Sequence, residues 1–264
     1  MNSLNQRDRH ISVRSLLPCV VVLLIMLLSA CQKTVAPSPL SPSSTPLPTL
    51  APTATVALPP PPTPTSPIVQ VTPTGDPAAY LASGKAHLEA GETAQAIPDL
   101  EAAVLLAPAL LEARFFLGNA YVASGRFTDA ETQFQAVLEI DPDYLAAHSN
   151  LGVVYLEMAR AEDAQAEFQA ALALDETDAQ VQYMLGVAYV RQGQLEAARG
   201  QFEKAIALDP ELPEPHFGLG TIYYLVQEKE KAIEAFETFL SKRPAQDPVA
   251  EAEARRILTL LKGQ

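Results

Sequence analysis

The chain has 264 residues, a formal net charge of −13 and only two cysteines, Cys19 and Cys31. An acidic surface repels phosphate backbones and anionic lipid headgroups, so the composition argues against nucleic-acid binding and against a helix lying on a membrane. Because no cysteine lies beyond residue 31, the rest of the chain can hold neither a disulfide framework nor a thiolate metal site.

Residues 1–30 have the pattern of a secretory signal peptide. Three arginines form a basic head, and residues 16–28 form an apolar run that is shorter than the ~20 residues of a spanning helix. The run ends in Leu28-Ser29-Ala30-Cys31, which resembles the lipobox of bacterial lipoproteins. The resemblance implies that Cys31 is acylated with diacylglycerol and becomes the first residue of the mature protein. The alternative is an uncleaved anchor in which Cys31 has no role.

A lipid anchor at Cys31 would hold the protein at a cell membrane or outer membrane, with its folded part facing the periplasm or the exterior. Each buried CH₂ contributes about 0.8 kcal/mol, so two or three acyl chains suffice without a spanning helix.

Residues 31–76 are rich in Pro, Thr and Ser, are nearly uncharged and include four consecutive prolines at 59–62. Such a tract cannot bury a core and predicts a disordered tether. A ligand for a proline-binding domain is the weaker alternative.

A glycine recurs every 34 residues through the remainder of the chain, at Gly84, Gly118, Gly152, Gly186 and Gly220. Columns of alanine, tyrosine, phenylalanine and proline keep the same step. A period of this length indicates a stacked repeat array, in which each unit covers the apolar side of its neighbour. The spacing divides the chain into five units, which are 77–110, 111–144, 145–178, 179–212 and 213–246.

Each unit carries two apolar stripes with helical spacing. The second unit shows the full motif, which is Leu117-Gly118, Tyr121, Gly125, Ala130, Phe134 and Pro142. This pattern resembles the tetratricopeptide repeat. The resemblance implies an all-α fold, namely a right-handed superhelical solenoid of antiparallel helix pairs with five repeat units and a C-terminal capping helix.

Two local signals predict where helices begin. Thr128 and Glu131 have the spacing of a capping box, which would open the second helix of the second unit. Asp247-Pro248 would open the capping helix within residues 247–264. The apolar face expected on that helix consists of Val249, Ala250, Ala254, Ile257, Leu258 and Leu261.

No constellation for catalysis is visible. Three histidines lie beyond the signal peptide, His87, His148 and His216, and all three occupy positions where packing residues are expected. His148 and His216 lie two repeats apart, too far to share a metal. No phosphate-binding glycine loop, nucleophile elbow or zinc signature is present. We therefore expect no enzyme activity, no metal and no cofactor.

The resemblance implies that function lies in the concave groove lined by the first helix of each unit. Many of its side chains are apolar or aromatic, which favours a peptide or helix ligand from a protein partner. The alternative is that adjacent first helices bury these side chains against each other, or that the C-terminal helix covers some of them. The candidate groove residues are Lys85, Phe115, Asn119, Asn150, Val153, Leu156, Tyr183, Val187, Arg191, Phe217 and Tyr224.

Some family members clamp a C-terminal carboxylate with Lys, Arg and Asn. Here Asn119 and Asn150 stand at clamp-type positions, but Phe115, Gln180 and Met184 replace the cations, so that activity is not expected. Asn119 and Asn150 could still bond a peptide backbone. Two other functions stay open: a structural or self-associating surface lipoprotein, and an accessory subunit of envelope polysaccharide synthesis or export.

Overall fold

The computed structural model describes residues 73–242 and 248–263. The predicted signal peptide, Cys31 and almost all of the tether lie outside these residues, as does Asp247. The described part contains eleven helices and no strand, which confirms the predicted all-α repeat fold. The helices are α2 (Pro77–Glu89), α3 (Thr93–Leu106), α4 (Leu111–Ala123), α5 (Phe127–Ile140), α6 (Leu145–Glu157), α7 (Ala161–Leu174), α8 (Ala179–Arg191), α9 (Leu195–Leu208), α10 (Glu214–Leu225), α11 (Lys229–Lys242) and α12 (Pro248–Lys262).

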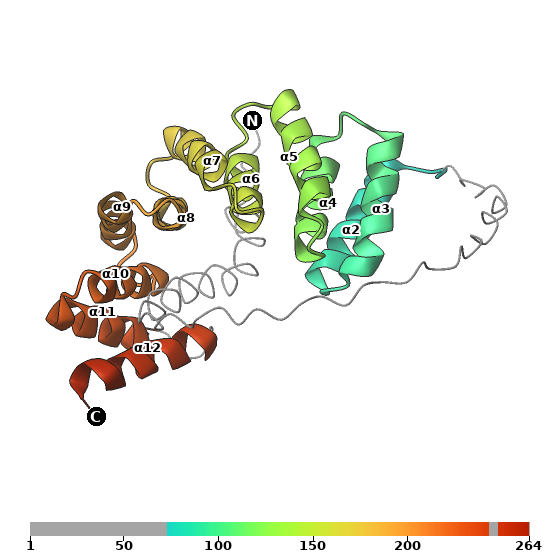
Figure 1. Ribbon diagram of the computed structural model, residues 1–264. Helices are drawn as coiled ribbons and strands as arrows, with labels where there is room; N and C mark the ends of the chain where they lie inside the picture. The colour runs from blue at the N-terminus through green and yellow to red at the C-terminus, as the bar shows by residue number, and fades with distance from the viewer. Residues whose placement is uncertain (1–72, 243–247, 264) are drawn as a thin grey trace, which may run out of the picture.

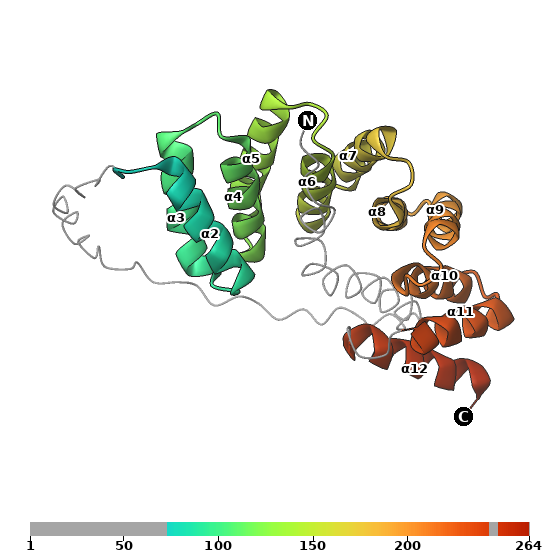
Figure 2. The ribbon, with the colours of Figure 1, turned by 180° about the vertical axis from the view of Figure 1, so that it is seen from behind.

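The helices pack as consecutive pairs stacked along an arc (Figures 1 and 2). Within each pair the two helices make the most extensive contact, and each second helix also contacts the first helix of the next pair. The first helices α2, α4, α6, α8 and α10 touch one another in succession. In Figure 1, α6, α8 and α10 lie on the inner side of the arc, while α7, α9 and α11 lie on the outer side. The first helices therefore form one continuous inner face.

The repeating glycine allows an aromatic ring to lie directly against a helix backbone. A Cβ added at Gly186 would lie 2.5 Å from Cε1 of Phe202, and one added at Gly218 would lie 2.6 Å from Cε2 of the same ring. The Phe202 ring is thus held between α8 of its own unit and α10 of the next. The phenylalanines at 134, 168 and 236 are also fully buried, so the 34-residue columns are the core of the array.

Two turns lack the glycine of the repeat but keep its left-handed backbone conformation. Gly125 and Gly193 turn the chain between paired helices with φ of 74°. Ala159 and Gln227 hold the equivalent turns with φ of 59° and 63°. A left-handed residue with a Cβ costs about 1–2 kcal/mol, which the packing of the flanking helices offsets without a change of fold.

The predicted capping box is wrong. Helix α5 begins at Phe127 with Arg126 at the cap position and no side-chain cap. The left-handed turn at Gly125 lets the Arg126 amide donate to the Tyr121 carbonyl at 2.8 Å, so the turn itself sets the start of the helix. Glu131 instead accepts a hydrogen bond from Arg160 Nη1 at 2.8 Å in the following unit.

Helix α12 packs against α11 and ends the array as expected. Ala250, Ala254, Ile257 and Leu258 are buried. Val249 was expected on the same face but is 47% exposed. Its side chain is rotated by about 100° from that of Ala250, which moves it off the stripe that faces α11.

Gly186 and Gly200 form a matched pair for testing the glycine contact. Gly186→Ala drives a methyl group into Phe202 and should lower the free energy of unfolding by about 2 kcal/mol. Gly200 lies within α9, where an added Cβ would meet no other atom within 4 Å, so Gly200→Ala should raise it by up to about 1 kcal/mol. Urea unfolding followed by circular dichroism measures both, and a Gly186→Ala protein as stable as the wild type would contradict the packing account.

Candidate binding groove

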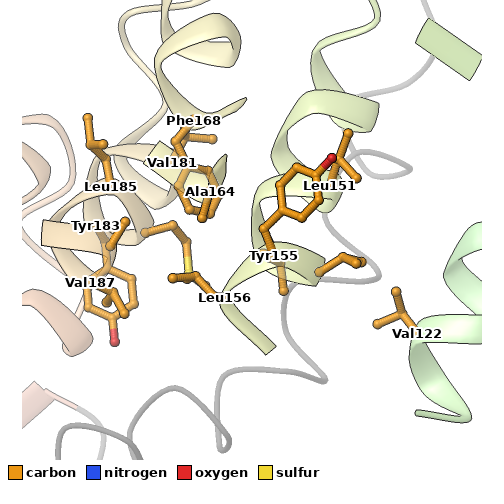
Figure 3. Close-up of a cluster of buried hydrophobic side chains, with 14 of the residues drawn as sticks. Val122, Leu151, Tyr155, Leu156, Ala164, Phe168, Val181, Tyr183, Leu185 and Val187 are labelled. Carbon is orange, nitrogen blue, oxygen red and sulfur yellow. The ribbon is translucent and has the colours of Figure 1, made fainter. Parts of the chain in front are cut away.

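The inner face is built from columns of residues that recur every 34 positions on the first helices. Phe115, Tyr183 and Phe217 share one column, and Val153 and Val187 share the next. Figure 3 shows Val122, Leu156, Tyr183 and Val187 from three first helices, with the Tyr183 hydroxyl directed away from Phe168 and Ala164 of α7. We call the inner face of α2, α4, α6, α8 and α10 the groove.

Most of the predicted groove residues are buried. Seven of them are at most 4% exposed, and these are Phe115, Asn150, Val153, Leu156, Tyr183, Val187 and Phe217. Lys85, Asn119, Arg191 and Tyr224 are partly exposed. The buried residues belong to the continuous hydrophobic core or border it, so their side chains also hold the fold together.

The aromatic residues of the groove contact the second helices. The Phe115 ring lies 5.9 Å from that of Phe134, and Tyr183 lies 5.7 Å from Phe202, between ring centroids. Phe217 lies 5.6 Å from Phe236. Because each ring supports its own helix pair, truncating it would disturb folding as well as any ligand contact.

Polar side chains join neighbouring units across the groove. Asn150 Nδ2 donates to Asn119 Oδ1 at 2.7 Å, which ties α6 to α4. The bond uses one donor group and one acceptor, and leaves the amide nitrogen of Asn119 and the carbonyl of Asn150 as polar groups on this face. Lys85 Nζ bonds Glu112 Oε1 at 2.7 Å and lies 4.6 Å from the Phe116 ring centroid, so its charge is already paired.

Arg191 and Glu157 occupy equivalent places at the ends of α8 and α6 and are both half-buried. Burial lowers the pKa of Arg191, and the negative charge of Glu157 only partly opposes that shift. Burial likewise raises the pKa of Glu157, opposed in part by Arg191. The Nε of Arg191 is buried and has no hydrogen-bond acceptor among the described residues.

Sequence reasoning missed a polar lock between consecutive units. Arg114 Nε donates to the Pro108 carbonyl at 2.6 Å, His148 Nε2 lies 2.9 Å from the Pro142 carbonyl, and Gln182 Nε2 donates to the Glu176 carbonyl at 3.3 Å. Residues 114, 148 and 182 are 34 apart, as are the three carbonyls. This shared spacing is the signal that could have revealed the lock. His148, expected to pack, therefore serves mainly as a hydrogen-bonding group, and its Nδ1 also lies 2.7 Å from Glu167.

The tyrosine column is used for contacts between units. The Tyr121 hydroxyl donates to Glu101 at 2.7 Å, and the Tyr155 hydroxyl accepts from Gln135 at 3.2 Å. The Arg126 guanidinium lies 4.2 Å from the Tyr121 ring centroid. Burial and the bond to Glu101 raise the pKa of Tyr121. These hydroxyls join α3 to α4 and α5 to α6.

Within residues 73–242 and 248–263, no group of three or more His, Cys, Asp or Glu side chains is arranged to hold a metal ion. No helix of this part of the chain combines the length and apolar character required to cross a bilayer.

His216 and Glu157 should change the free energy of unfolding in opposite directions as the pH falls. Burial, with a smaller contribution from Lys242, lowers the pKa of His216, so below about pH 6.5 the unfolded chain binds a proton that the folded chain does not. His216 therefore contributes stability that falls as the pH falls through this window. His216→Gln should flatten the loss of unfolding free energy on acidification.

A variant of Glu157 should change the pH dependence of stability in the opposite direction. Its raised pKa means that the folded chain binds a proton first, so this group gains stability as the pH falls towards its ordinary pKa. Glu157→Gln should therefore steepen the acid loss. Urea unfolding at a series of pH values from about 7 down to about 4.5 measures both slopes, and slopes that change in the same direction for the two variants would contradict this account.

Comparisons with known proteins agree with the geometry. A family model described as "TPR repeat" matches residues 118–158 and 188–227, and one described as "Tetratricopeptide repeat" matches residues 77–110 and 145–178. Together the matches span about half of the chain. No curated protein matches it.

Solved structures of similar fold cover about two thirds of the chain. MamA from Desulfovibrio magneticus RS-1 is 28% identical with a TM-score of 0.60, covering 66% of this chain and 98% of its own. TTC0263 from Thermus thermophilus is 18% identical with a TM-score of 0.56, covering 71% and 100%. YrrB, described as a TPR protein with an unusual peptide-binding site, is 22% identical with a TM-score of 0.56, covering 69% and 92%. Because the repeat models match about half of the chain, it belongs to the tetratricopeptide-repeat family.

Proposed function

We propose that this protein is a lipid-anchored extracytoplasmic scaffold that binds a peptide or helix segment of a protein partner in its groove, in the assembly of an envelope complex. The observation that carries the proposal is the continuous inner face, where apolar side chains of five units adjoin a few polar groups that reach across units. A protein of similar fold, YrrB, is described as having a peptide-binding site. The amide of Asn119 and the carbonyl of Asn150 offer a donor and an acceptor to a peptide backbone.

The scaffold is proposed to be non-catalytic because most of its candidate reactive side chains have structural partners. His216 is the exception among the histidines, since its buried Nε2 has no hydrogen-bond partner among the described residues. His87 Nδ1 lies 2.7 Å from Glu92, and His148 lies between Glu167 and Pro142. Several tyrosine hydroxyls bond residues of the preceding unit. Catalysis needs such groups to converge on one reacting atom, whereas here they serve separate junctions.

Self-association is the second candidate, favoured by one observation. Ile140, Leu174 and Leu208 recur every 34 residues on second helices and are 41–45% exposed. These residues end α5, α7 and α9, and a regular aliphatic column at the ends of the second helices could contact a second array. No feature of the described residues favours a role in polysaccharide synthesis or export.

A photo-crosslinking amino acid at Asn119 tests the groove, and one at Leu174 provides the matched control on the outer side. Asn119 is partly exposed and Leu174 is exposed. Replacing Asn119 removes its bond to Asn150 but no core ring, so it should disturb folding less than a change at Phe115 or Tyr183. In the native host, one heterologous protein should crosslink from Asn119 and not from Leu174, as identified by mass spectrometry. Crosslinks only to a second copy of this chain, formed from Leu174, would overturn the groove assignment in favour of self-association.

The lipid anchor is tested separately, with Cys19 as the control because it precedes the lipobox. Cys31→Ala should abolish incorporation of labelled palmitate and leave the precursor unprocessed, because the acyl acceptor is missing. Cys19→Ala should leave both steps intact. Gel mobility, label incorporation and membrane fractionation provide the readout, and unchanged processing and retention of Cys31→Ala would show that Cys31 carries no anchor.

A further inference from the structure

We infer that the edge of the array at which the second helices end is a docking surface for a cationic amphipathic helix of a protein partner. We call it the turn edge, and it consists of residues 139–144, 173–178 and 207–214. The inference goes beyond the proposed function, because this surface is formed by helix ends and turns rather than by the inner face of the first helices. Two features support it: a row of exposed aliphatic side chains and a surplus of carboxylates beside that row.

The antiparallel pairing of the helices brings these residues to one edge. Each first helix runs away from the edge and its paired second helix returns to it, so α5, α7 and α9 all end there, at Ile140, Leu174 and Leu208. Short turns then lead into α6, α8 and α10 (Figure 1). The 34-residue spacing therefore becomes a row of equivalent side chains, one from each unit.

The row is apolar and open to solvent. Ile140, Leu174 and Leu208 are 45%, 42% and 41% exposed. Ala173 and Ala207, which precede the two leucines, are exposed as well and extend the apolar surface. A single exposed leucine is ordinary, whereas equivalent aliphatic residues in three successive units form a surface that the side chains of a partner can cover.

Carboxylates flank the row, and the turns carry no cation of their own. Residues 139–144, 174–178 and 208–214 contain nine acidic residues and no Lys or Arg. Asp141, Asp175 and Asp209 each accept a hydrogen bond from the backbone amide two residues later, at 3.0–3.1 Å. Asp143 and Glu176 are exposed and form no ion pair with another described residue. Their charges are therefore open to a partner.

Two lysines restrict the negative potential to the middle of the array. Lys204 lies one helical turn before Leu208, and Lys242 pairs with Glu211 at 3.1 Å. The positions one turn before Ile140 and Leu174 are instead alanines, at 136 and 170. The ends of α5 and α7 should therefore be the centre of the docking surface.

Charge complementarity selects the partner. Two copies of this chain that met through the turn edge would bring their carboxylates together, which is unfavourable. Anionic lipid and nucleic acid are repelled for the same reason. A partner with Lys or Arg beside its aliphatic residues would cover the row and neutralise the carboxylates. A helix presents such side chains at i, i+3 and i+4 and satisfies its own backbone hydrogen bonds.

Three labelled Ala-rich helical peptides test the inference by fluorescence anisotropy with the full chain. The first has leucines at i, i+3 and i+7 with flanking lysines, the second has Glu in place of Lys, and the third has Ser in place of Leu. The Lys–Leu peptide should bind about tenfold more tightly than either of the others, since each of these lacks one of the two contributions.

Variants of the row locate the apolar contact. Leu174→Ser should weaken binding of the Lys–Leu peptide about fivefold. Ile140→Ser should do the same and replaces the first variant if circular dichroism shows that it does not fold. Leu260→Ser is the matched control, because Leu260 is 56% exposed on α12, outside the turn edge. It should leave the affinity unchanged.

Paired charge variants separate the turn edge from the general field of an acidic chain. Asp143→Asn with Glu176→Gln should weaken binding of the Lys–Leu peptide about fivefold and reduce its salt dependence. Glu162→Gln with Glu230→Gln removes the same charge from the first turns of α7 and α11, at the opposite edge, and should have little effect. Equal weakening by the two pairs would overturn the inference, as would unchanged affinity of both Leu174→Ser and Ile140→Ser.

Two further results bear on the partner. A dimer of the full chain in sedimentation equilibrium that Leu174→Ser converts to a monomer would make a second copy the occupant and overturn the inference. In the native host, a basic protein that crosslinks from Leu174 and differs from the protein captured at Asn119 would support it. Because the groove is tested from Asn119, failure at the turn edge would leave the proposed groove function standing.

Discussion

The array depends on one contact, the approach of a phenylalanine ring to a glycine on the paired helix. A hydrogen in place of a methyl lets the Phe202 ring reach the backbone of α8 at Gly186, and Gly218 gives it the same access to α10. The ring therefore fixes both the distance within a pair and the distance to the next pair. Phe134, Phe168 and Phe236 make the same close contact with the glycine of their own pair, and Leu100 takes this place in the first unit. Since dispersion contacts fall off steeply with separation, this contact sets the distance within all five helix pairs.

The same packing gives the groove two roles. The side chains that line it continue into the core, since the rings of Phe115, Tyr183 and Phe217 lie against the phenylalanine column or its neighbours. A ligand would therefore meet a surface that is already held in place, with little conformational entropy left to lose on binding. Such preorganisation also means that the shape of the groove is fixed by the same residues that stabilise the array.

Polar groups divide into those with a structural partner and those without one. The lock formed by Arg114, His148 and Gln182 joins successive turns on one side of the helix pairs, and the tyrosine hydroxyls join successive helices on another. Buried polar groups generally find partners because an unpaired one is costly. Several polar atoms on the groove helices, among them Arg191 Nε, have no hydrogen-bond partner within the described residues.

The sequence alone determined the repeat, the helix pairs, the glycine and phenylalanine columns and the final helix, because a 34-residue period with helical stripes admits one way of burying its apolar residues. It mislocated the start of α5, since the turn at Gly125 outweighs a local capping pattern. Only the tertiary structure decided which polar residues bond each other. Asn119 and Asn150 stand 31 residues apart, and Tyr121 and Glu101 stand 20 apart, and such pairs depend on the superhelical placement of whole helices. That placement engages some polar side chains between units and leaves Arg191 Nε without an acceptor among the described residues, which no local pattern in the sequence specifies.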